Sequence, residues 1–139
     1  MVGLSIPEDF PLSNLVAQEL TQVCIGAYHV RMNFYRPMAS SALQQQWEPG
    51  ASIDIEAGYE FHEIGVPVQS ALNENLGAKA GCLTTLLGQH IVSVERLSEN
   101  ELLLVFSSGS KLQLLTDPVG YESYHIHIDG ETVDVTVCK

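Results

Sequence analysis

Two histidines near the C-terminal end of the chain have the spacing of a metal-binding pair. His125 and His127 are separated by one residue in a run that alternates apolar and polar side chains. Successive side chains of a β-strand point to opposite faces, so both imidazoles would share one face and could ligate one Zn²⁺ ion. The competing interpretation is that both histidines face solvent on the polar side of a sheet. The sequence predicts no cofactor.

Acidic residues dominate the charge of the chain. Seventeen Asp and Glu residues oppose six Lys and Arg residues, so the formal net charge is −11, and the acids are spread from Glu8 to Asp134. A broadly negative surface repels nucleic-acid phosphates and anionic lipids, which argues against nucleic-acid or membrane partners. It attracts basic proteins or cationic ligands. The alternative is that the acidity only keeps the protein soluble.

Five residues in the middle of the sequence are candidates for partner binding. A basic protein could be bound by the carboxylates of the central segment, and an aromatic side chain nearby could anchor the interface because aromatic residues are common interface anchors. The aromatic residue could equally close one end of the core. The candidates are Asp54, Glu56, Glu60, Glu63 and Trp47.

The usual signatures of enzyme chemistry are missing from the sequence. There is no Gly-x-Ser-x-Gly nucleophile elbow. Lys79 lies between Gly77 and Gly81 instead of following the second glycine of a phosphate-binding loop. Cys82 has no assignable histidine partner, so a thiol packed in the core is the better interpretation. We therefore predict that the protein is not an enzyme and has no catalytic residue.

The cysteines and the N-terminal residues predict a cytoplasmic protein. Cys24, Cys82 and Cys138 are widely spaced and odd in number, which is typical of reduced thiols rather than of a secreted disulfide framework. The first ten residues have neither a basic start nor a long apolar run, so they do not resemble a signal peptide.

The elements that would position the two histidines are strands of an antiparallel sheet. Residues 122–128 and 132–137 alternate apolar and polar side chains, which is typical of strands with one face buried. Asp129-Gly130 between them tolerates the positive φ angles of a tight hairpin turn. We expect Tyr124, Ile126 and Ile128 to face the core.

The two halves of the chain resemble each other in their pattern. Leu15–Phe34 and Leu87–Phe106 each run from an apolar start to an alternating segment that ends in phenylalanine, and a glycine-led strand follows each. We expect a single domain over residues 1–139, with pseudo-repeats at 15–64 and 87–138 and a connector at 65–86. The predicted fold is α+β and mostly antiparallel β. The two strand units would share one curved or barrel-like sheet, with one short helix near residues 80–87.

The C-terminal half also resembles a known group of proteins. The residues that carry the resemblance are the Leu87-Gly88 entry, Phe106 before Gly109, and Tyr121-Glu122-Ser123-Tyr124. From residue 87 onward the chain is similar to small bacterial domains of unknown function that end in a Tyr-Glu-Ser-Trp/Tyr segment. Some such proteins lie near toxin systems, as immunity partners do. The resemblance brings no catalytic residues.

Three classes of function follow from these patterns. The first is a non-enzymatic acidic binding protein, of which an immunity protein that neutralises a basic toxin domain is the most concrete form. The second is a metal or small-ligand module built on His125 and His127. The third is a structural protein whose edge strands form a homodimer.

Overall fold

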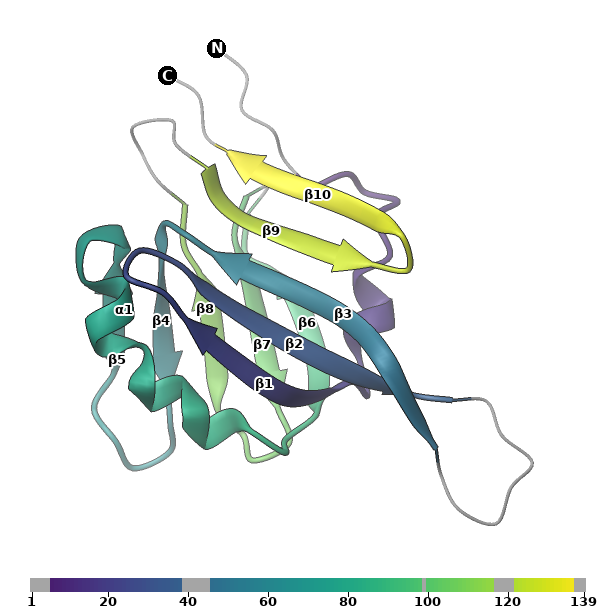
Figure 1. Ribbon diagram of the computed structural model, residues 1–139, viewed down its shortest axis with the longest axis horizontal. Coiled ribbons are helices and arrows are strands. Elements are labelled where there is room, and N and C mark those ends of the chain that lie inside the picture. The colour runs from purple at the N-terminus through teal and green to yellow at the C-terminus, as the bar shows by residue number, and fades with distance from the viewer. Residues whose placement is uncertain (1–5, 39–45, 99, 117–121, 137–139) are drawn as a thin grey trace.

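The part of the chain that the structure describes folds into two antiparallel sheets of five strands each, packed face to face (Figure 1). This computed structural model describes residues 6–38, 46–98, 100–116 and 122–136. We call the sheet nearer the viewer in Figure 1 the front sheet and the other the back sheet. Their strands cross in the view instead of running alongside each other.

Neighbours in each sheet include strands that are far apart in sequence. The front sheet has the order β1-β2-β3-β9-β10, and the back sheet has the order β5-β4-β8-β7-β6. The front strands are β1 (Glu19–Ile25), β2 (Val30–Pro37), β3 (Trp47–Ile55), β9 (Glu122–Ile128) and β10 (Glu131–Thr136). The back strands are β4 (Gly58–His62), β5 (Gln69–Leu72), β6 (Ile91–Arg96), β7 (Leu102–Phe106) and β8 (Lys111–Leu114).

The strands form because their apolar residues recur at every second position. In β2 the buried residues are Val30, Met32 and Phe34, and in β7 every second residue from Leu102 to Phe106 is likewise buried. Each strand therefore presents one apolar face, and the two sheets bury these faces against each other. The predicted inward positions of β9, Tyr124, Ile126 and Ile128, are fully buried as expected.

Each half of the chain supplies three consecutive strands to one sheet and a hairpin to the other. The first half forms β1-β2-β3 of the front sheet and then β4-β5 of the back sheet. The second half forms β6-β7-β8 of the back sheet and then β9-β10 of the front sheet. The two halves thus exchange their hairpins, so that each sheet is built from both halves.

The two sheets also share a local irregularity. In the front sheet the register shifts just after Leu20, which pairs with Phe34. In the back sheet it shifts just after Ile91, which pairs with Phe106. A bulge adds one residue to one strand of a pair. Two bulges at equivalent places extend the correspondence between the halves from strand order to individual residues.

The single curved or barrel-like sheet expected from the sequence is replaced by two sheets. The chain leaves the front sheet after Ile55 and enters the back sheet at Gly58, which has a φ of +152°. A Cβ at Gly58 would lie 2.3 Å from the carbonyl oxygen of Ala71, so only glycine fits this crossing. The sheets meet again where Glu19 bridges to His90, and Ala17 donates to the carbonyl of Ile91.

Two helical segments, made of four short elements among the described residues, accompany the sheets. Residues 73–86 form η2 (Asn73–Asn75), the single α-helical turn α1 (Leu76–Lys79) and η3 (Ala80–Leu86), and η1 (Leu12–Leu15) precedes β1. The helix expected near residues 80–87 is therefore a 3₁₀-helix. Ala80, Leu83 and Leu86 are buried at a spacing of three, which matches the three residues per turn of that helix.

The predicted connector at residues 65–86 also contains a strand that the sequence did not reveal. β5 has four residues and follows Pro67, so its alternation is too short to recognise. Gly88 ends the helical segment with a φ of +84°, as a helix C-cap requires. No helix among the described residues is long and apolar enough to cross a membrane.

Candidate functional site

The outward face of the front sheet carries a row of five side chains, one from each strand, that lie directly opposite one another. Strand register pairs each member with the next. Because paired residues of antiparallel strands have neighbouring side chains on the same face, the row is continuous across the sheet. We call it the charged row: Cys24, Arg31, Asp54, His125 and Asp134.

Arg31 and Asp54 form a two-pronged ion pair at the start of the row. Arg31 Nε donates to Asp54 Oδ1 at 2.7 Å, and Nη2 donates to Oδ2 at 3.0 Å. His29 approaches the same carboxylate, with Nε2 3.4 Å from Oδ1. Burial raises the pKa of Asp54, but the hydrogen bonds and charge of Arg31 outweigh it, so the pKa of this carboxyl lies below its usual value.

His125 lies between two carboxylates further along the row. Its Nδ1 is 2.5 Å from Asp134 Oδ1, and its Nε2 is 3.2 Å from Glu56 Oε2. In the imidazolium form, both ring nitrogens carry a hydrogen and donate a hydrogen bond to these carboxylates. Partial burial lowers the pKa of His125, but the hydrogen bonds and charges of Asp134 and Glu56 together raise it above the ordinary value. The row therefore alternates in sign when His125 is protonated.

A second row on the same face is polar and carries no carboxylate or guanidinium. Asn33 donates to Gln22 Oε1 at 2.9 Å, and His127 is hydrogen-bonded to Thr132. The neutral row lies beside the charged row because its residues occupy the next outward positions of the same strands. Its members are Gln22, Asn33, Ser52, His127 and Thr132.

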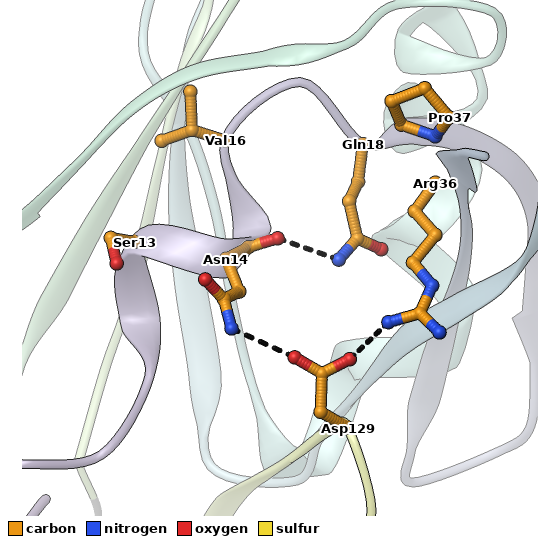
Figure 2. A pocket seen from close by; sticks show the side chains of 7 residues that line it. All are labelled: Ser13, Asn14, Val16, Gln18, Arg36, Pro37 and Asp129. Atoms are coloured by element: carbon orange, nitrogen blue, oxygen red, sulfur yellow. Dashed lines mark hydrogen bonds and ion pairs between the residues drawn. The ribbon is translucent and has the colours of Figure 1, made fainter. Parts of the chain in front are cut away.

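A hollow of about 310 Å³ lies where the β9–β10 turn meets η1 and the end of β2 (Figure 2). Asp129 lines it between Asn14 and Arg36, where one carboxylate oxygen accepts a hydrogen bond from Asn14 Nδ2 at 2.8 Å and the other pairs with Arg36. Arg36 Nε also donates to Glu48 Oε1 at 2.7 Å. These contacts hold the turn against β2, and so hold the strands that carry His125.

Gln18 forms the wall of this hollow and joins η1 to β3. Its side chain is buried, Nε2 donates to the carbonyl of Asn14 at 2.7 Å, and Oε1 accepts the Ala51 N–H at 2.8 Å. A Cβ at Gly50 would lie 2.2 Å from Gln18 Oε1, so the bond to Ala51 requires glycine at that position. A second hollow, of about 550 Å³, adjoins Arg36 and Asp129 and reaches His127.

Carboxylates outnumber guanidinium groups on this side of the molecule. Both arginines of β2, Arg31 and Arg36, are already bound to carboxylates. The two cations are therefore neutralised locally, and the surrounding surface keeps a negative excess. The carboxylates of the face and of its turn end are Glu48, Asp54, Glu56, Asp129 and Asp134.

The structure brings some of the predicted partner-binding residues together and separates others. Asp54 and Glu56 lie beside His125 on the front sheet. Glu60 is on β4 of the back sheet, where its carboxylate is 3.2 Å from His62, and Glu63 follows the end of β4. Trp47 opens β3 at the end opposite Asp54 and is 42% exposed.

The two predicted metal ligands do share one face, as their spacing requires. His125 and His127 occupy neighbouring rows, and both ring nitrogens of His125 already contact carboxylates. Within residues 6–38, 46–98, 100–116 and 122–136, no group of three or more His, Cys, Asp or Glu side chains could hold a metal ion. A metal site on this pair stays a prediction.

Arg31 and Asp134 are the site residues that sequence reasoning missed. Nothing local marks either one, since each is a single charged residue within an alternating strand. They become neighbours of Asp54 and His125 only through strand register. Of the cysteines, Cys24 ends the charged row and Cys82 contacts the Tyr59 hydroxyl at 3.4 Å, both as free thiols. Cys138 lies outside the described residues.

Comparison with known proteins assigns no relative to this chain. No family model, no curated protein sequence and no solved structure matches it.

Proposed function

We propose that this protein is a non-enzymatic binding protein that captures a basic protein partner on the outward face of its front sheet. The observation that supports this most directly is the acidic front face around the charged row, where both arginines of β2 are already paired and carboxylates outnumber them. Asp134 ends the row with a side chain that is 51% exposed. An immunity-type protein that neutralises a basic toxin domain is the most specific form of this proposal.

The physical argument is one of complementary charge. An acidic face raises the rate at which a basic partner is encountered and disfavours acidic competitors. Arg31 and Arg36 are held by carboxylates, so they offer little repulsion to an approaching lysine or arginine. Asp54 keeps its charge to a lower pH than an ordinary aspartate, because the hydrogen bonds and charge of Arg31 lower its pKa despite burial.

The test compares two pairs of substitutions that change the net charge equally. Glu56→Gln with Asp134→Asn removes two charges from the front face, and Glu60→Gln with Glu95→Gln removes two from the back sheet. Both pairs are made in a His125→Gln background, so that titration of this histidine does not contribute. The probe is a short lysine-rich peptide whose binding is followed by NMR titration of the labelled protein.

We expect the front pair to weaken binding about fivefold, since each surface charge contributes a few tenths of a kcal/mol to about 1 kcal/mol. The back pair should change binding much less, and salt should weaken binding to the parent protein. Shifted amide signals should map to β3, β9 and β10. Equal weakening by both pairs would mean that only net charge matters, and the proposal would then be wrong.

A further inference from the structure

We propose that the basic partner docks as an extended strand that pairs with β10 and becomes a sixth strand of the front sheet, with a lysine or arginine opposite Asp134. This inference rests on the proposed function, because it specifies how the same face is used. It is carried by the position of β10 in the sheet and by the order of charges across the strands.

β10 is an open edge within the part of the chain that the structure describes. Its one strand neighbour among the described residues is β9, and Glu131, Thr132 and Asp134 are exposed. The β9–β10 turn has φ angles of +52° and +81°, as a two-residue hairpin turn requires. In such a hairpin the residue pair next to the turn is joined by main-chain hydrogen bonds. Beyond it, pairs without and pairs with these hydrogen bonds alternate along the two strands. The main-chain groups of Thr132 and Asp134 therefore point away from β9.

The other ends of the two sheets are engaged with neighbouring segments. At the β1 end of the front sheet, Gly88 donates to the carbonyl of Leu20, and Ala17 donates to the carbonyl of Ile91 at the start of β6. The short β5 edge of the back sheet packs beside α1. β6 is as long as β10 and carries the exposed Glu95, but Ile91 at its start is bonded to Ala17, and its last residue donates to main-chain carbonyls of the N-terminal segment. β10 combines the same length with an acidic outward residue and, in the described part of the chain, a single neighbouring strand.

The charge order across the row specifies the chemistry of the added strand. From Arg31 to Asp134 the signs are positive, negative, positive when His125 is protonated, and negative. Oppositely charged residues directly across two strands stabilise their pairing, and like charges oppose it. Among the residues that the structure describes, Asp134 has a cationic neighbour on the His125 side only, so the next strand should place a lysine or arginine at that position.

The neighbouring residues of β10 specify the remainder of the pattern. Val133 and Val135 point inward and are already buried, so the inward side of an added strand would continue this apolar face and carry apolar residues. Thr132 belongs to the neutral row and faces solvent beside Asp134. The partner segment therefore alternates cationic or polar residues with apolar ones. A second copy of this chain fits poorly, because each copy carries a formal charge of −11.

Three synthetic peptides distinguish strand addition from charge attraction alone. The first alternates lysine and valine, the second contains the same residues in two blocks, and the third is the alternating peptide with N-methyl groups along one edge. The first should bind about tenfold more tightly than the third, which loses the main-chain hydrogen bonds of one edge. It should also slow hydrogen exchange at the amides of Thr132 and Asp134.

A variant of the protein tests the same edge. Thr132→Pro removes a main-chain N–H that points away from β9 and keeps every charge of the face. Thr132→Ala is the matched control, because it keeps that N–H. The proline variant should bind the alternating peptide about tenfold more weakly than the alanine variant. If the proline variant is not folded by circular dichroism, the N-methylated peptide decides the question with the unaltered protein.

The outcomes separate this inference from the proposed function. If the block and alternating peptides bind the front face equally well and N-methylation has no effect, strand addition is wrong and charge-based capture stands. If no peptide binds the front face, the proposed function itself fails. Sedimentation that shows a dimer of this chain, abolished by Thr132→Pro, would overturn the inference in favour of a second copy.

Discussion

The front and back sheets have equivalent strand order and register, but the side chains that they expose to solvent differ. Their equivalent positions follow from the bulges and the registers: Phe34 corresponds to Phe106, and Tyr124 corresponds to Tyr59. All four are buried. Both tyrosine hydroxyls donate to backbone carbonyls, and burial raises the pKa of both.

The outward rows at equivalent positions do not match. On the back sheet, Leu103 occupies the place of Arg31, Gln113 that of Asp54, and Glu60 that of His125. The alternating charges of the front sheet are therefore absent from this row of the back sheet. The full back row is Glu95, Leu103, Gln113, Glu60 and Ser70.

This difference separates the residues that make the fold from those that could make contacts. Inward positions must remain apolar in both sheets, because each apolar face is buried against the other. Outward positions of a sandwich can change without disturbing that packing. The charges of the front row are therefore not required by the shared fold, which makes the front face the better candidate for a binding role.

The largest predicted effect tests the equivalence of the two cores. Phe34→Ala and Phe106→Ala should each lower the free energy of unfolding by about 3–5 kcal/mol, since each removes a buried ring. The two losses should agree to within about 1 kcal/mol, near the spread expected for such sites. Chemical denaturation measures both, with Val92→Ala at an exposed position as the control.

A large loss at one phenylalanine and a small one at the other would break the comparison. The two halves would then share strand order but not the packing of their cores.

A smaller effect tests the charged row through pH. The folded pKa of His125 is raised, so its contribution to stability is present below the ordinary value of about 6.5 and is lost as pH rises through the folded pKa. His125→Gln should therefore cost about 1 kcal/mol near pH 5 and almost nothing near pH 9. Glu60→Gln, at the equivalent position of the back sheet, should not reproduce this profile.

Denaturation of both variants over that pH range gives the measurement. A cost for His125→Gln that is the same at both pH values would mean that the carboxylates of Glu56 and Asp134 do not stabilise the imidazolium.

The smallest predicted effect converts one position of the front row to its back-sheet counterpart. Arg31→Leu should cost about 0.5–1 kcal/mol at neutral pH, because it removes a partly exposed two-pronged ion pair. The folded pKa of Asp54 is lowered, so this contribution is present above the ordinary Asp value of about 3.9 and is lost as pH falls through the folded pKa.

Acid titration of stability, followed by tryptophan fluorescence or circular dichroism, provides the measurement. The variant should begin to lose stability at a higher pH than the parent, because Arg31, the main group that opposes the effect of burial on the pKa of Asp54, is then gone. An unchanged acid transition would show that Arg31 does not hold the charge of this carboxylate.

Local patterns in the sequence predicted much of the secondary structure. The β9–β10 hairpin follows from its alternation and from Asp129-Gly130, whose positive φ angles the structure contains. β5 was not predicted, because a strand of four residues shortly after a proline shows too little alternation to be recognised. The short helix expected near residues 80–87 is present as a 3₁₀-helix, whose buried residues recur every three positions.

The residues of the candidate site were also only partly predictable from the sequence. His125 and Asp54 could be named from the sequence as polar residues on strands, and both lie on the front face. Their partners could not, because Arg31 and Asp134 are separated from them by many residues or by a turn, and only register brings them opposite. Glu60, grouped with Asp54 by proximity in sequence, lies on the other sheet.

The sequence by itself determined which residues alternate, where the chain turns, which side of each strand is apolar and that the surface is acidic, because these depend on neighbours within a few positions. Only the tertiary structure decided that the strands divide into two sheets, that the halves exchange hairpins, and that five distant side chains form one charged row. Such pairings depend on contacts between segments far apart in the chain, and no local pattern encodes which strands become neighbours in a sheet.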